Sequence, residues 1–271
     1  MKFTLPRAVA TAVVCALTQA AMAQAPRTVQ LEDMTWTELR DAIHAGKTTI
    51  IIPIGGTEQS GPYVALGKHN ARVKVLSERI AEGLGNAIVA PVIAYVPEGS
   101  YAPPTSHMRF PGTITVPDNV FEKTLESAAN SFRIHGFRNI VFLADHGGYQ
   151  NDVRLVVGQL NTAWAASGAR AFVPPEYYGT SSDGYAQILR QHGVPDSQIG
   201  THAGLADTSL LLAVAPQMVR LDSLRSAPQP GPADGVYGGD PRHSTGELGK
   251  LGADAIVSRT IDAIRKETSG R

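Results

Sequence analysis

Two residues with metal-binding and proton-transferring side chains follow the first aliphatic run of the chain. Residues 50–54 are Ile-Ile-Ile-Pro-Ile, which is typical of a buried strand, and two glycines then allow a tight turn. Glu58 comes directly after this turn, and His69 lies further along the same predicted loop. Because ligands bind at the carboxyl ends of parallel strands, a carboxylate and an imidazole here indicate a metal site or an acid–base site.

Another predicted strand, residues 139–144, ends in the same way. It leads into Asp145 and His146, and two glycines follow. The tips of parallel strands lie at one edge of a sheet, so we expect His146 to converge with Glu58. Imidazoles and a carboxylate together suit Zn²⁺ and, less specifically, Mn²⁺ or Fe²⁺. Asp145 either orients one of the imidazoles or caps the next helix.

Two further stretches carry polar residues of the same kinds. His202 precedes a predicted loop-to-helix turn, and Asp207 begins the helix, where a carboxylate can also serve simply to favour the helix N-terminus. His107 and Arg109 lie in a loop punctuated by Pro and Gly. Loops rich in specific polar residues often line substrates, so both side chains are candidates for substrate binding.

The elements that must position these residues alternate between strand and helix. This alternation predicts an α/β fold with a mostly parallel sheet covered by helices on both faces. Thr35 is a candidate N-cap for the first helix. The predicted strands cover residues 49–54, 87–95, 139–144 and 169–173, and the predicted helices cover residues 31–44, 71–84, 117–135, 151–167, 206–215 and 246–266.

The N-terminus has the pattern of a cleavable signal peptide over residues 1–23. Two basic residues precede a short apolar stretch, and Ala21–Ala23 forms an Ala-x-Ala cleavage motif. The apolar stretch is too short to cross a bilayer as a stable helix, and it contains the sole cysteine, Cys15. We therefore expect an exported protein, periplasmic or secreted, whose mature chain is a single domain over residues 24–271 without thiols.

The charge balance of the chain is even, with 24 Lys and Arg residues against 24 Asp and Glu residues. Such a balance offers no general attraction to nucleic acid or to an anionic membrane. The expected partner is a small-molecule substrate.

Five ordered motifs run along the chain. They are Glu-Gln-Ser-Gly-Pro-Tyr (58–63) leading to His69, Phe-Pro-Gly-Thr (110–113), Ala-Asp-His-Gly-Gly (144–148), His-Ala-Gly-Leu-Ala-Asp-Thr-Ser (202–209) and Gly-Asp-Pro (239–241). Together they resemble the creatininase (creatinine amidohydrolase) family across nearly the whole mature chain. The resemblance implies a three-layer α/β/α fold and a metal-dependent amidohydrolase that acts on non-peptide C–N bonds of small or cyclic amides. It also implies a homo-oligomer, often a hexamer.

The same resemblance implies one retained metal site and one lost site. The family's centre holds two metals bridged by an Asp, whose position His69 takes in this chain. The first metal would be held by Glu58, His69 and His146, which are all competent ligands. The second would require Ser60 and Gly148 beside His69, and neither offers a good ligand. We therefore expect one divalent ion per chain, with Zn²⁺ preferred over Mn²⁺ or Fe²⁺.

Catalytic roles follow from the same motifs. An ion of this kind would activate a water molecule and polarise the substrate carbonyl. His202 and Asp207 are the candidates for proton transfer, with His202 preferred as the acid because the family motif places it beside the substrate. His107 is a weaker alternative for this role. Together with Arg109 and Tyr149, His107 is also a candidate substrate-binding residue.

Two alternatives remain beside the amidohydrolase. A lactone or ester hydrolase could use the same site, and a non-catalytic binding protein could retain a decayed hydrolase fold. The enzyme is preferred because the first metal site still has three competent ligands, since His69 replaces the family's Asp with another side chain that binds metals. A serine nucleophile is disfavoured because neither Ser60 nor Ser106 lies in a Gly-x-Ser-x-Gly turn.

Overall fold

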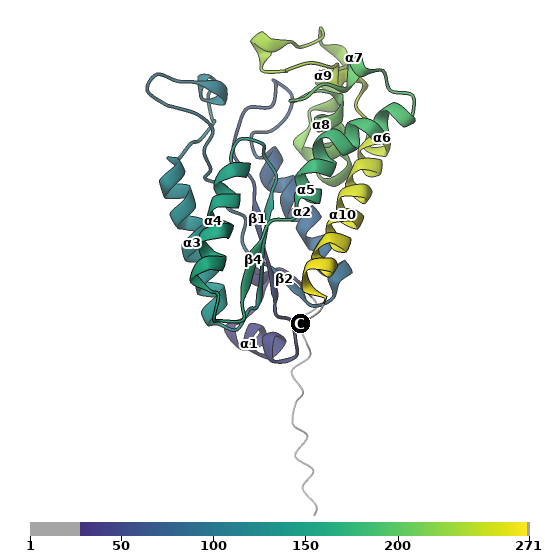
Figure 1. Cartoon of the computed structure of the whole chain (residues 1–271). Coiled ribbons are helices and arrows are strands. Elements are labelled where there is room, and N and C mark those ends of the chain that lie inside the picture. The colour runs from purple at the N-terminus through teal and green to yellow at the C-terminus, as the bar shows by residue number, and fades with distance from the viewer. Residues whose placement is uncertain (1–27, 270–271) are drawn as a thin grey trace, which may run out of the picture.

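The computed structural model describes residues 28–269 of the 271-residue chain (Figure 1). The predicted signal peptide, with Cys15 and the Ala21–Ala23 motif, lies outside the described residues. Among the described helices, none is both long enough and apolar enough to cross a membrane.

A parallel four-stranded sheet forms the centre of the described part of the chain. The strand order is β2-β1-β3-β4. The central pair, β1 and β3, is in register along its whole length, from Thr49 opposite Asn139 to Ile54 opposite Ala144. This register brings the segments that follow the two strands to the same edge of the sheet. The strands are β1 (Thr49–Ile54), β2 (Ala87–Val89), β3 (Asn139–Ala144) and β4 (Arg170–Phe172).

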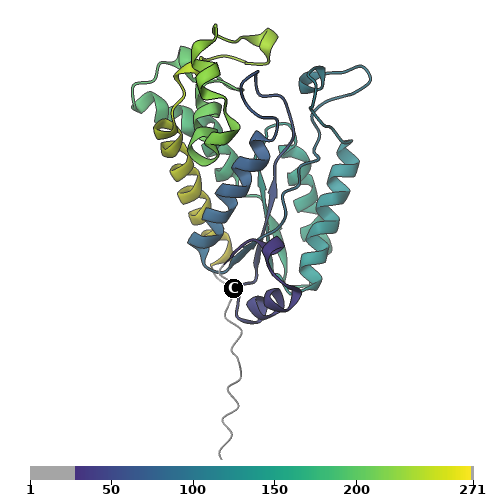
Figure 2. The same cartoon turned by 180° about the vertical axis from the view of Figure 1, so that it is seen from behind.

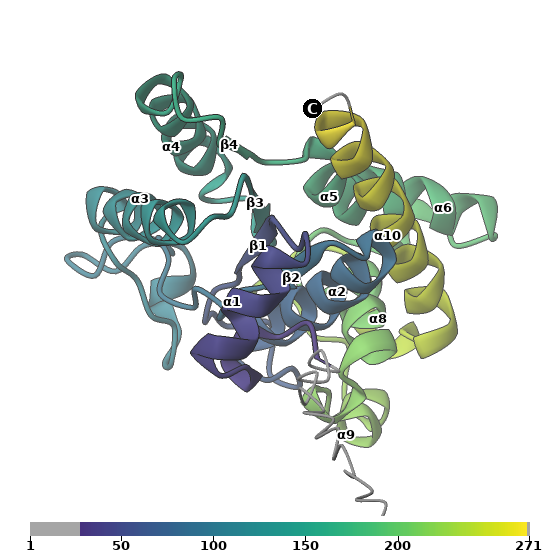
Figure 3. The same ribbon diagram turned by 90° about the horizontal axis from the view of Figure 1, so that it is seen from below.

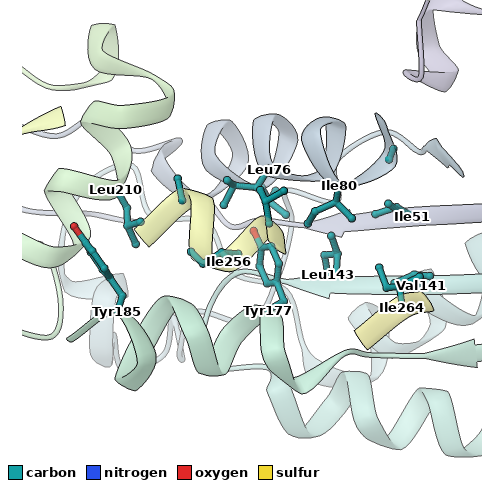
Figure 4. Packing of buried hydrophobic residues seen from close by; sticks show 14 of the residues in the cluster. Ile51, Leu76, Ile80, Val141, Leu143, Tyr177, Tyr185, Leu210, Ile256 and Ile264 are labelled. Atoms are coloured by element: carbon teal, nitrogen blue, oxygen red, sulfur yellow. The ribbon is translucent and has the colours of Figure 1, made fainter. Parts of the chain in front are cut away.

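Helices cover both faces of the sheet, as the predicted three-layer fold requires (Figure 3). Side chains alternate along β1, so Ile51 belongs to the core shared with α2, α8 and α10, which Figure 4 shows. Ile50 and Ile52 belong to the other core, under α3 and α4. The covering helices are α2 (Lys68–Leu84), α5 (Pro175–Gly179), α8 (Leu205–Val214) and α10 (Gly246–Thr268) on one face, and α3 (Asp118–Ile134) and α4 (Gln150–Ala163) on the other.

Shorter elements complete the described chain. Thr35 caps α1 as predicted, in a capping box with Glu38. Several of these elements lie above the carboxyl ends of the strands, as seen from behind in Figure 2. The shorter elements are α1 (Trp36–His44), which lies at the opposite end of the strands, α6 (Tyr185–Gln191), α7 (Asp196–Ile199), α9 (Leu221–Ser226), a π-helical turn (Thr180–Gly184), and 3₁₀ helices at Leu31–Asp33, Ser106–Arg109, Pro216–Met218, Pro232–Asp234 and Pro241–His243.

Four predicted boundaries were wrong by three residues or more, one of them the end of α4, which lies at Ala163 rather than at residue 167. β2 ends at Val89 rather than at residue 95, and Pro91, which has no N–H to donate, lies just beyond its end. The first predicted helix begins only at Trp36, after a 3₁₀ turn. α2 begins at Lys68, so His69 lies in its first turn and not in a loop. The polar start of α2 has no apolar periodicity that would have revealed it.

The turn after β1 is fixed by a close approach of the first turn of α2. The Asn70 side-chain oxygen accepts the Gly56 N–H at 2.9 Å. A Cβ atom at Gly55 would lie 2.1 Å from that oxygen, so only glycine fits there. This contact holds the segment that carries Glu58 against α2.

The contact between α8 and α10 also depends on a glycine. A Cβ atom at Gly249 would lie 1.7 Å from the Ser209 carbonyl oxygen. We predict that Gly249→Ala lowers the free energy of unfolding by about 1–3 kcal/mol, because the two helices must move apart. Urea denaturation would measure this change.

Gly158→Ala provides the matched control. Gly158 is exposed in the interior of α4, where an added Cβ meets no atom within 4 Å. This variant should be more stable than the wild type by about 0.5–1 kcal/mol, since Ala loses less backbone entropy in a helix. A Gly249→Ala protein as stable as the control would contradict the proposed close packing.

Candidate metal centre and pocket

A cavity of about 600 Å³ opens at the carboxyl ends of the strands. Its walls come from the first turn of α2, the segment after β3, the N-terminal end of α8 and the elements between Tyr178 and Thr201. All five sequence-predicted polar residues on strand tips and helix starts contact or line this region: Glu58, His69, His146, His202 and Asp207. The expected convergence of the strand tips is therefore confirmed.

The Glu58 carboxylate is completely buried at the centre of this group. Its Oε1 atom lies 2.7 Å from His69 Nε2, 3.4 Å from Lys68 Nζ and 3.7 Å from His202 Nδ1. Burial alone would raise the pKa of Glu58, but the charges of Lys68 and His69 outweigh burial and hold that pKa well below its usual range. Glu58 is thus ionised in the folded protein.

The other oxygen of Glu58 faces a group of four potential metal ligands. Ligand atoms of Glu58, Glu98, His107 and His146 all lie within 4.8 Å of one another. Glu58 Oε2 and both oxygens of Glu98 are buried without a hydrogen-bond partner in the described part of the chain. Buried carboxylate oxygens without partners carry a large free-energy cost unless a cation or a proton satisfies them. The donor set of two carboxylates and two imidazoles fits a divalent ion.

The protonation states of the two imidazoles agree with a metal site, whereas Glu98 holds a proton that a bound cation would displace. Burial, reinforced by the neighbouring Glu58 charge, raises the pKa of Glu98 to about 9. Burial lowers the pKa of His146 to about 3 and also lowers that of His107. Both imidazoles are therefore neutral near pH 7, which is the form that binds a metal.

His69 was predicted as a ligand, but the structure places both of its ring nitrogens on carboxylates. Nε2 faces Glu58, and Nδ1 lies 2.7 Å from Asp145 Oδ2. Asp145 also accepts hydrogen bonds from Arg72 and from the Tyr177 hydroxyl. Of the two roles considered for Asp145, the geometry shows the one that orients an imidazole. His69 therefore bridges two buried carboxylates. Glu98 and His107 lie beside Glu58 and His146, where they can complete the set of metal ligands.

Asp207 was predicted to transfer protons, but it is held between two cations. It accepts hydrogen bonds from Lys68 Nζ and, at 2.6 Å, from Arg72 Nη1, and the Ala203 N–H donates to it at 3.0 Å. Burial would raise its pKa, but Lys68 and Arg72 hold the pKa of Asp207 well below the usual range. An ionised carboxylate with these partners positions Lys68 and Arg72 and is a poor proton acceptor.

His202 has one ring nitrogen available to the site. Its Nε2 lies 3.0 Å from the Gln59 carbonyl oxygen and 3.2 Å from the Gln59 side-chain nitrogen, and its Nδ1 is directed toward Glu58. Burial and the nearby Lys68 charge lower the pKa of His202 to about 4. His202 is therefore neutral near pH 7 and able to accept a proton before it returns one, whereas the sequence favoured it as an acid.

The remaining predicted substrate-binding residues have different positions. His107 lines the cavity, and the Gln59 side-chain nitrogen lies 2.9 Å from its Nδ1. Arg109 is exposed, and its Nε donates to the Ser106 carbonyl oxygen at 3.1 Å. Tyr149 is fully buried, with its hydroxyl on the Ile54 carbonyl oxygen at 2.9 Å. Neither Arg109 nor Tyr149 lines the cavity.

Sequence reasoning missed Glu98, Lys68 and Arg72. Glu98 follows an apolar run that begins with β2, so the same logic that singled out Glu58 and His146 applies to it. Its backbone N–H is held by Thr115 Oγ1 at 3.0 Å. Lys68 and Arg72 gave no such signal, since basic residues on a helix are usually exposed.

The fold and the site together define an α/β/α protein with a candidate metal centre at the tips of parallel strands. The creatininase family model, described as creatinine amidohydrolase, matches residues 32–264. The chain therefore belongs to the creatininase family.

Individual relatives agree with this membership. The chain is 26% identical to the creatinine amidohydrolase of Pseudomonas putida over 262 residues, which cover 89% of this chain and 98% of that protein. It is 28% identical to the mycofactocin precursor peptide peptidase of Mycolicibacterium smegmatis, over 67% of this chain and 64% of the peptidase. A solved creatininase superposes with a TM-score of 0.71 at 23% identity, covering 91% of this chain and all of that one, which confirms the fold.

The raised pKa of Glu98 predicts a pH dependence of stability in chelator-treated protein. Folded Glu98 keeps its proton up to about pH 9, whereas a glutamate in the unfolded chain is ionised above about pH 4.5. A raised folded pKa stabilises the fold at low pH, and this contribution is lost as the pH rises toward that pKa. The free energy of unfolding should therefore fall by about 2 kcal/mol between pH 7 and pH 9, as measured by urea denaturation.

Two variants isolate this effect. Glu98→Gln should remove most of the fall, because the amide does not titrate. Glu176→Gln, which changes an exposed glutamate, should leave it in place. An unchanged slope in Glu98→Gln would show that another group causes the pH dependence.

Proposed function

We propose that this protein is a divalent-metal-dependent hydrolase of a C–N bond in a small substrate bound in the strand-tip cavity. The observation that carries the proposal is the pair of buried carboxylates, Glu58 and Glu98, whose unpartnered oxygens face two neutral imidazoles. A divalent ion would satisfy all of these atoms at once.

We propose Glu58, Glu98, His107 and His146 as the ligands of one ion per chain. Zn²⁺ is the preferred ion for this nitrogen–oxygen set, with Mn²⁺ and Fe²⁺ as alternatives. Solved creatininases include a manganese form and a zinc–zinc form, which supports a divalent metal. A second ion is not expected, because Gly148 offers no side chain and His69 is engaged by two carboxylates.

A divalent ion bound here would polarise the scissile carbonyl and acidify a water molecule. His202 would accept a proton from that water and return one to the leaving nitrogen, since its neutral ring is directed into the site. His69, Asp145 and Arg72 form a buried hydrogen-bonded chain that fixes the orientation of Glu58.

The class of substrate follows from the family rather than from the cavity. The relatives are described as acting on creatinine, on a mycofactocin precursor peptide and, in Thermotoga maritima, on 3-dehydro-scyllo-inosose. A cyclic amide is our preferred substrate, and a lactone or ester would undergo the same attack on its carbonyl. A screen of small cyclic amides and lactones against the metal-loaded protein would identify the substrate. A metal-free protein that binds such a compound unchanged would instead be a binding protein.

We also propose a cellular location and an assembly state. The signal-peptide pattern of residues 1–23 supports export to the periplasm or beyond. Membership of the creatininase family supports a homo-oligomer, with a hexamer as the expected size.

The ligand assignment predicts the metal content. Elemental analysis of protein purified without chelators should give about one zinc-type ion per chain. His146→Ala should lose most of this metal, because loss of one of the ligands sharply weakens the site. His192→Ala should retain it, since His192 is exposed and its ring nitrogen Nδ1 lies 2.9 Å from the Ile188 carbonyl oxygen, away from the candidate ligands. Two tightly bound ions, or none, would contradict the single-ion site.

The role of His202 predicts a separation of binding from turnover. His202→Ala should keep about one ion per chain but slow hydrolysis by about 10²–10⁴-fold, as expected for loss of a general acid–base group. The rate constant kcat on any substrate from the screen measures this effect. A His202→Ala enzyme with wild-type kcat would exclude the residue from proton transfer.

A further inference from the structure

Resting on the function proposed above, we propose that Lys68 is the group that binds and stabilises the oxygen of the scissile carbonyl as negative charge develops on it. The substrate class is accordingly one whose carbonyl oxygen becomes an oxyanion during attack, such as an amide, lactam or ester. The inference depends on the placement of the Lys68 ammonium beside Glu58, at the wall of the cavity.

Lys68 is buried in a way that is rare for lysine. It is 1% exposed, yet it is one of the residues that line the cavity. Lysine is almost never fully buried unless its charge is paired. Its partners are two carboxylates, Asp207 and, with Nζ at 3.4 Å, Glu58 Oε1.

These two partners leave part of the ammonium free. An ammonium group has three N–H donors, and within residues 28–269 no hydrogen-bond or ion-pair partner other than these carboxylates lies close to it. The third donor is therefore available to a ligand in the cavity.

The Lys68 ammonium and the two candidate imidazole ligands face different oxygens of the Glu58 carboxylate. Lys68 contacts Oε1 of Glu58, whereas His107 and His146 face Oε2, with their Nε2 atoms at 3.3 Å and 3.6 Å. A carbonyl that enters the cavity beside the ligand group therefore comes close to the ammonium. The geometry therefore places a fixed cation beside the candidate metal ligands, where it can stabilise an oxyanion.

The position of Lys68 is fixed before any substrate binds. Asp207, which holds the ammonium, is itself held by Arg72 Nη1 and by the Ala203 N–H. Lys68 also starts α2, whose close contact at Gly55 and Asn70 secures the same turn as Glu58. A donor that is already oriented costs little reorganisation during the reaction.

Inorganic phosphate is a suitable probe, because it presents oxyanions to both the ion and the ammonium. Calorimetry on the zinc-loaded protein should detect phosphate binding. Lys68→Met should weaken this binding at least about tenfold, which corresponds to loss of one charge-assisted hydrogen bond. The same variant should keep about one zinc per chain with equal or higher affinity, because a positive charge beside Glu58 has been removed. A purely structural role would lower zinc affinity as well.

Two further variants keep the result interpretable. Lys74→Met, on the same helix, removes an exposed lysine that pairs with Glu32 at 3.6 Å and should change neither affinity. Lys68→Met combined with Asp207→Asn removes both members of the buried pair, and it should show the same loss of phosphate binding if the single variant folds poorly.

The outcomes separate this inference from the proposed function. Wild-type protein that binds no zinc would contradict the proposed function itself. Zinc-loaded wild type that binds no phosphate, or Lys68→Met that binds it as tightly as the wild type, would overturn the role of Lys68. Loss of zinc from both Lys68 variants would assign the residue to structure and overturn it too.

Discussion

The site depends on one constraint, the complete burial of the Glu58 carboxylate. An ionised group without water must be surrounded by donors and cations, or its burial would destabilise the fold. Lys68 and His69 meet this requirement at Oε1, and Asp207 and Asp145 in turn balance their charges. The positions of α2 and α8 relative to the sheet follow from these contacts.

The other oxygen of Glu58 has no comparable partner, and this imbalance gives the site its chemistry. Glu98 lies beside it with two oxygens that also lack hydrogen-bond partners in the described part of the chain. The two side chains therefore place several buried acceptor oxygens together, and only a cation or a proton can satisfy them. In chelator-free protein a divalent ion would fill that role, and in its absence a proton on Glu98 does, as its raised pKa shows.

The structure gives several polar residues of the site roles that their motif positions did not predict. His69 occupies a motif position from which a ligand was expected, but it serves as a hydrogen-bonded bridge between Glu58 and Asp145. Residues from the segment between β2 and α3, Glu98 and His107, instead face the candidate metal position. The buried Lys68 supplies a further fixed positive charge beside the other oxygen of Glu58.

The sequence by itself determined the parallel α/β framework, the exact extent of β1 and β3, and the convergence of Glu58 with His146. Buried strands have continuous aliphatic runs, and parallel strand tips must share one edge, so local patterns suffice for these features. Only the tertiary structure decided which atoms of His69, Asp207 and Glu98 face one another. These contacts depend on hydrogen-bond partners that are distant in the chain. The protonation states of the three side chains depend on their burial, and no local sequence pattern encodes either property. Tyr149 illustrates the difference, because it was a candidate for substrate binding, whereas the structure buries it with its hydroxyl on the backbone of β1.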